Sequence, residues 1–205
     1  MVVRCIISQI KSIFDRSLKG KLIDEKDVEN YASASRKNLH SILQYNLIHA
    51  GINCGYIAIP EYKVHFKEPL DKNKLGITSK RLMHQIRVDV AFIREQEFQG
   101  IGEVYTLDEI HGCIPSKELE EPWLTPYDKL HYAIEQSEKE IKFLVLVNVC
   151  PENLNKEQLP WKDQRKRSIK DWKNLWEKLA KELSNRAKVG HIMLSEDEKI
   201  ISKIY

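Results

Sequence analysis

One stretch near the middle of the chain constrains the fold most, because two strand-like segments there each carry one carboxylate. The first segment covers residues 86–93 and holds Asp89, and the second covers residues 100–106 and holds Glu103. β-Branched and aromatic residues favour strands, and the polar linker at residues 94–99 is long enough for a chain reversal. The sequence therefore predicts a β-hairpin here.

The two carboxylates of this hairpin are expected to meet. Side chains alternate across a strand, which places Asp89 on the face of Arg87 and Ala91, and Glu103 on the face of Tyr105. If these faces come together, both carboxylates enter one pocket, where they repel unless a cation lies between them. Mg²⁺ accepts one or two protein carboxylates and keeps other positions for water and phosphate. The structural alternative is that Asp89 pairs with Arg87 and Glu103 faces solvent.

The composition indicates a folded protein with a packed core. Of the 205 residues, 42% are apolar and 31% are charged, which argues against long disordered segments. No apolar run approaches the roughly 20 residues of a membrane span, and residues 1–8 lack the features of a signal peptide. We therefore expect a cytoplasmic protein without a membrane partner. The net charge of +3 permits nucleic-acid binding without requiring it.

The cysteines and histidines show no metal-binding spacing. The four cysteines are far apart and form no CxxC pair, and the seven histidines form no HxH or HExxH motif. We expect reduced, buried thiols, and a disulfide is the less common alternative.

Hydrophobic periodicity predicts helices and strands around the hairpin. Apolar residues recur at helical spacing in residues 2–18, 35–50 (closed by Gly51) and 165–188, the longest of the predicted helices. A further helix is expected to begin at residues 125–128, where threonine, proline and aspartate suit a helix start. Strands are predicted at residues 55–59 and 62–66, interrupted or bent at Pro60, and at residues 141–149, 191–194 and 199–205. An α/β domain at 35–205 with an N-terminal helical extension at 1–34 fits this order.

The order of these elements resembles the restriction-endonuclease-like, or PD-(D/E)xK, superfamily. The segments RVDV and GIGEVYT carry the resemblance, with Asp89 and Glu103 as the specific motif matches. The resemblance extends over roughly residues 35–194 and implies an α-β-β-β-α-β core with a central mixed sheet flanked by helices. It also implies that Asp89 and Glu103 hold Mg²⁺ or Mn²⁺, with the backbone carbonyl of Val104 as a further ligand.

The third position of the family triplet departs from the pattern, because Tyr105 stands where the family has lysine. In the family that lysine positions or activates the attacking water, and tyrosine is not a fixed cation at neutral pH. Three explanations stay open. A lysine from a neighbouring element supplies the charge, with Lys129 favoured over Lys63 and Lys80; Tyr105 orients the water by a hydrogen bond; or the hydrolytic machinery is lost.

Other parts of the family pattern have candidates as well. The family often adds an acidic residue from the first core helix or strand, and Glu61 is favoured over Glu29 for this role. Positive charge for a phosphate backbone is expected from residues 67–81, from Arg87 and from residues 165–173.

Together these residues predict a metal-dependent nuclease of the endonuclease, repair or resolvase type that hydrolyses the phosphodiester bonds of nucleic acid, with DNA as the expected substrate. Its catalytic residues are expected to be Asp89, Glu103, Lys129, Tyr105 and Glu61. One alternative is an inactive nuclease-fold protein that binds nucleic acid or a protein partner. Another is an unrelated α/β protein whose hairpin carboxylates form structural ion pairs. A homodimer would suit a nuclease that cuts both strands.

Overall fold

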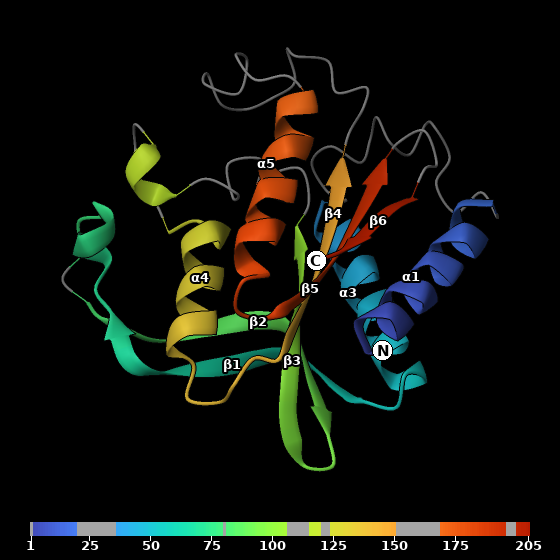
Figure 1. Cartoon of the computed structure of the whole chain (residues 1–205), viewed down its shortest axis with the longest axis horizontal. Helices are drawn as coiled ribbons and strands as arrows, with labels where there is room; N and C mark the ends of the chain where they lie inside the picture. The colour runs from blue at the N-terminus through green and yellow to red at the C-terminus, as the bar shows by residue number, and fades with distance from the viewer. Residues whose placement is uncertain are drawn as a thin grey trace.

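The computed structural model describes residues 2–19, 36–79, 81–105, 115–119, 124–150, 169–195 and 200–205. These residues form four α-helices and one six-stranded sheet (Figure 1). The helices are α1 (Val2–Lys19), α3 (Arg36–Asn53), α4 (Pro126–Gln136) and α5 (Ile169–Leu183). The strands are β1 (Ile57–Leu70), β2 (Met83–Arg94), β3 (Glu97–Tyr105), β4 (Phe143–Cys150), β5 (Lys188–Ser195) and β6 (Ile200–Ile204).

The sheet is mixed, with the strands in sequence order from β1 to β6. Strand β2 runs antiparallel to its neighbours β1 and β3, the strands β3, β4 and β5 are parallel, and β6 is antiparallel to β5. Strand β4 lies in the middle and is covered on both faces, which accounts for its nearly continuous apolar run. The predicted α/β class with a central mixed sheet flanked by helices is confirmed.

Helices cover both faces of the sheet (Figure 1). Helices α4 and α5 pack on one face and form one apolar cluster, and helices α1 and α3 pack on the other and form a second. Neighbouring residues of β4 go to different clusters, Leu144 to the first and Val145 to the second, as strand alternation requires. No described helix is long and apolar enough to cross a membrane.

Helix α1 is packed into the core of the sheet domain. Its residues Val3, Ile6 and Ile10 are fully buried in the cluster shared with α3 and the sheet. A disulfide joins Cys5 to Cys54, whose Cα atoms are 6.0 Å apart. The expectation of reduced thiols is therefore wrong for this pair, because the fold brings together two residues that are distant in sequence. The predicted boundary at residue 34 lies outside the described residues and stays a prediction.

Two predicted helix ends are wrong. Helix α3 continues past Gly51 to Asn53, because Gly51 serves packing: a Cβ there would lie 2.5 Å from the Phe92 ring. The chain turns instead at Gly55, which has a φ of +81°, the conformation that favours glycine. Helix α5 has 15 residues and ends at Leu183, so in its described part it is shorter than α1 and α3.

Strands β1 and β2 form a long two-stranded ribbon in which the alternation of side chains is interrupted at one point. Even-numbered residues therefore face opposite sides of the sheet before and after that point. On one side of that point, Val64 and Val88 pack with the cluster of α4 and α5. On the other side, the even-numbered Phe92 packs with the cluster of α1 and α3. The register places Glu61 opposite Asp89 at the change, and Glu61 has a left-handed φ of 51°. The predicted segments at 55–59 and 62–66 therefore belong to one strand, as the alternative of a bend allowed, and the distortion is at Glu61, next to the predicted Pro60.

Candidate functional site

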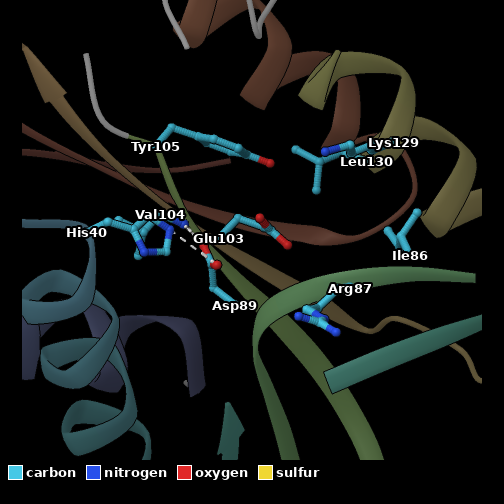
Figure 2. Close-up of a pocket in the computed structure, with 9 residues that line it drawn as sticks. All are labelled: His40, Ile86, Arg87, Asp89, Glu103, Val104, Tyr105, Lys129 and Leu130. Carbon is cyan, nitrogen blue, oxygen red and sulfur yellow. Dashed lines mark hydrogen bonds and ion pairs between the residues drawn. The ribbon is translucent and has the colours of Figure 1, made fainter. Parts of the chain in front are cut away.

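Asp89 and Glu103 line the same pocket, which has a volume of about 130 Å³ (Figure 2). Its walls come from helices α3 and α4 and from strands β2 and β3, and the lining residues are His40, Ile86, Arg87, Asp89, Glu103, Val104, Tyr105, Lys129 and Leu130. The two hairpin carboxylates, which the sequence predicts to meet, thus line one cavity.

The path of strand β2 places Asp89 in this pocket. Simple alternation predicts Asp89 and Ala91 on one face, but Val88 and Ala91 both pack in the cluster of α4 and α5. Alternation is therefore interrupted between Val88 and Ala91, and the predicted common face of Arg87 and Ala91 is wrong. Pairing of β2 with β3 stops at Val90 and Gly102, so β2 leaves β3 beyond this point. The separation of the two strands makes room for the pocket.

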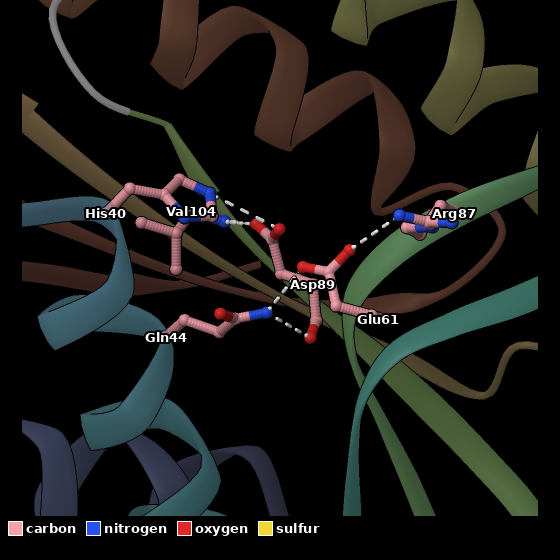
Figure 3. A network of polar contacts seen from close by, with 6 residues as sticks. All are labelled: His40, Gln44, Glu61, Arg87, Asp89 and Val104. Carbon is pink, nitrogen blue, oxygen red and sulfur yellow. Dashed lines mark hydrogen bonds and ion pairs between the residues drawn. The ribbon is translucent and has the colours of Figure 1, made fainter. Parts of the chain in front are cut away.

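Several polar groups hold Asp89 in place (Figure 3). The backbone N–H of Val104 donates to Asp89 Oδ2 at 2.7 Å, which satisfies a strand group that β2 no longer pairs. His40 Nε2 lies 3.3 Å from Asp89 Oδ1. The side-chain amide of Gln44 donates to the carbonyl of Asp89 and to Glu61 Oε1, both at 2.9 Å. Asp89 is therefore anchored from β3 and from α3.

The carbonyl of Val104 is directed to the same edge of β3. In a β-strand, the N–H and C=O of one residue point to the same side. Because the N–H of Val104 reaches Asp89, its carbonyl also faces the gap between β2 and β3. This is the orientation that a metal-ligating carbonyl would need.

Glu103 is almost buried, with 9% of its surface exposed. It lies between Ile101 and Tyr105 on the face covered by α4 and α5, and it borders the pocket (Figure 2). A carboxylate is costly to bury and needs hydrogen-bonding or charged groups nearby. Lys129 and Leu130 on α4 form part of the wall around it.

The start of α4 fixes the place of Lys129. Thr125 is the N-cap, its side chain accepts a hydrogen bond from the N–H of Asp128, and Pro126 occupies the first turn. The carboxylate of Asp128 also accepts from the N–H of Ser116 at 2.8 Å. The helix start predicted from the sequence is confirmed, and it places Lys129 in the first turn of α4, beside the pocket.

Tyr105 lines the pocket as a packed aromatic wall. Its ring stacks on Trp176 of α5 with centroids 4.9 Å apart, and only 5% of its surface is exposed. Among the described residues that line the pocket, Lys129 is the one lysine. Lys63 is exposed on β1 away from this lining, and Lys80 lies outside the described residues.

Glu61 lies beside the pocket and is not part of its lining. Its side chain is half exposed, accepts from Gln44, and forms an ion pair with Arg87 at 3.5 Å (Figure 3). The alternative acidic residue, Glu29, falls outside the described residues.

His40 and Gln44 are the site residues that sequence reasoning missed. They lie one turn apart on α3, so their side chains share a face of the helix, and both reach Asp89. The available signal was this pair of polar residues four positions apart, the spacing that places two side chains on one face of a helix.

The donor set of the pocket suits a hard divalent cation. Asp89, Glu103 and the Val104 carbonyl offer oxygen ligands, which Mg²⁺ and Mn²⁺ prefer. No cluster of three or more His, Cys, Asp and Glu side chains within the described ranges forms a ready metal site. Water or substrate would have to complete the coordination, and the ion would share Asp89 with His40 and the Val104 N–H.

No family model, curated protein or solved structure matches this chain.

Proposed function

We propose that this protein is a metal-dependent nuclease that hydrolyses phosphodiester bonds of DNA in the pocket of Asp89 and Glu103. The observation that carries the proposal is that Asp89, Glu103 and Lys129 surround one cavity. Two carboxylates with a nearby cation are the groups that phosphodiester hydrolysis needs. The element order α3-β1-β2-β3-α4-β4 supports the proposal, because it is the order that the resemblance to the restriction-endonuclease-like superfamily implies.

Asp89, Glu103 and the Val104 carbonyl would hold Mg²⁺ or Mn²⁺. When bound, the ion lowers the pKa of a coordinated water and offsets charge on the phosphate oxygens. Asp89 is oriented before substrate arrives, because His40 and the Val104 N–H each contact one of its oxygens. Preorganisation of this kind lowers the cost of reaching the transition state.

Lys129 takes the role that the missing family lysine would have. Its position in the first turn of α4, at the pocket wall, lets its ammonium stabilise negative charge that develops on the phosphate. Tyr105, stacked on Trp176, closes one side of the pocket and limits the entry of water.

An inactive nuclease-fold protein that binds nucleic acid is the second candidate. It is favoured by the packing of Tyr105 at the lysine position, and by the lack of a three-residue metal cluster among the described side chains. This candidate predicts DNA binding without cleavage in either metal, and Mn²⁺ binding that is weak or absent.

The test is cleavage of single-stranded, duplex and branched DNA with Mg²⁺ or Mn²⁺, together with calorimetry of Mn²⁺ binding. Asp89→Asn and Glu103→Gln keep the shape of each side chain and should each lower the cleavage rate by at least about 100-fold. Lys129→Gln should lower it by about 10- to 100-fold while Mn²⁺ still binds.

Glu95→Gln is the matched control, because Glu95 is an exposed carboxylate in the turn of the same hairpin. This variant should cleave like the wild type. The proposal fails if the wild type cleaves none of the three substrates, or if Asp89→Asn retains full activity.

A further inference from the structure

The ribbon of β1 and β2 has two unlike faces beyond Glu61 and Asp89. Its inner face packs towards α4, where the ring of Phe66 meets Tyr132 edge to face at 4.9 Å. The buried inner residues are Val64, Phe66, Ile86 and Val88. Its outer face carries exposed basic residues, which are Lys63, His65, Lys67 and Arg87. Strand alternation therefore gathers the positive charge of this ribbon on one side.

The basic residues of the outer face lie next to one another. The register puts Lys63 directly opposite Arg87. Like charges at directly opposed positions destabilise a strand pair. Arg87 is paired with Glu61 at 3.5 Å, and within the described part of the chain no carboxylate forms an ion pair with Lys63 or Lys67. A bound polyanion would relieve this repulsion.

The row of basic residues leads to the pocket. Arg87 belongs both to the outer face and to the pocket lining. Lys63 lies opposite Arg87 on the neighbouring strand. From Lys63 the row continues along β1 through His65 to Lys67, with a step of about 6.7 Å for every second residue of a strand. The outward positions 63, 65, 67, 85 and 87 hold no Phe, Tyr or Trp that could stack on bases. The surface is suited to phosphate groups.

We infer that the outer face of the β1–β2 ribbon is a track for the phosphodiester backbone of nucleic acid, and that it guides one strand towards Asp89 and Glu103. Recognition is electrostatic and independent of base sequence. The part of this inference that leads the nucleic-acid strand to Asp89 and Glu103 rests on the proposed function. Binding to the track can be measured separately from cleavage.

Two double variants with the same change in net charge test the track. Lys63→Gln with Lys67→Gln removes two charges from the ribbon, and Lys181→Gln with Lys188→Gln removes two exposed charges from α5 and β5. Binding to labelled duplex and single-stranded DNA is followed by fluorescence anisotropy over a range of salt concentrations, with EDTA present to prevent cleavage.

The ribbon variant should bind about tenfold more weakly at low salt, and the slope of log K against log salt should fall by about 2. The α5 and β5 variant should match the wild type. In cleavage assays the ribbon variant should raise KM and leave kcat unchanged, because its lysines are outside the pocket.

The track is refuted if the wild type does not bind DNA, or if the two double variants lose affinity equally. If the ribbon variant alone loses affinity while no protein cleaves DNA, the nuclease proposal fails and the track stands. If DNA is cleaved and both variants bind equally, the track fails and the nuclease proposal stands.

Discussion

Glu103 and His191 lie in one row across the sheet but have different surroundings. Both are in register with Leu146 of β4, and both side chains point to the face covered by α4 and α5. Glu103 borders the pocket that forms where β2 separates from β3. His191 is closed in the core, with 3% of its surface exposed.

The buried ring of His191 has a hydrogen-bond partner within the protein. His191 Nε2–H donates to Asn148 Oδ1 at 2.7 Å, and both side chains are buried. Desolvation lowers the pKa of His191 to about 4, so the ring is neutral near pH 7. The place of a polar residue in the sheet, rather than its burial alone, therefore decides whether it can reach a ligand.

The largest effect on stability is expected from protonation of the buried His191. The folded-state pKa of His191 is about 4 and its ordinary value is 6.5, so the unfolded chain binds more protons between these values. Stability from the neutral ring is complete above pH 6.5 and is lost as the pH falls towards about 4. The loss amounts to about 3 kcal/mol, at about 1.4 kcal/mol per pKa unit.

His191→Gln removes the titrating group and keeps an amide that can bond Asn148. Denaturant unfolding of both proteins across this pH range measures the difference, which also cancels the acid response of the carboxylates. The variant should lose less stability in acid than the wild type. Parallel curves for the two proteins would contradict the role of His191.

The next largest effect is expected when the hydrogen bond between His191 and Asn148 is removed at neutral pH. Asn148→Leu leaves the buried His191 without its acceptor and should lower the free energy of unfolding by about 1–3 kcal/mol. Asn174→Leu, at an exposed position of α5, is the control and should change stability little. On the proposed function, DNA cleavage per folded molecule should stay at the wild-type level, and its loss in Asn148→Leu would show that the His191–Asn148 pair also serves the pocket.

The smallest effect is expected where a residue acts through Asp89. His40→Gln removes the ring that lies 3.3 Å from Asp89 Oδ1. On the proposed function it should weaken Mn²⁺ binding and cleavage by about tenfold. His49→Gln, an exposed histidine on the same helix, is the control. A loss of thermal stability without any change in Mn²⁺ affinity would make His40 a structural residue.

Several elements of the fold could be predicted from local sequence patterns. The hairpin, the apolar strand β4 and the start of α4 at Thr125 each depend on residues that are neighbours in sequence. Such features follow from strand propensity, burial and helix capping, which act over a few residues. The same local signals placed Asp89 and Glu103 on adjoining strands and Lys129 at the start of a helix.

Other features depended on contacts that no local pattern records. The Cys5–Cys54 disulfide and the reach of His40 and Gln44 to Asp89 join segments that are distant in sequence. The exchange of faces at Glu61 was also hidden, because a non-glycine residue with positive φ has no reliable sequence signature.

The sequence by itself determined which strands carry carboxylates and which segments are buried, because hydrophobic spacing and caps are local. The tertiary structure decided that Asp89 and Glu103 border a cavity while His191 and Asn148 are sealed in the core. That choice depends on where β2 separates from β3 and on where α5 closes over the sheet. Both are outcomes of packing between distant elements, which strand alternation alone does not specify.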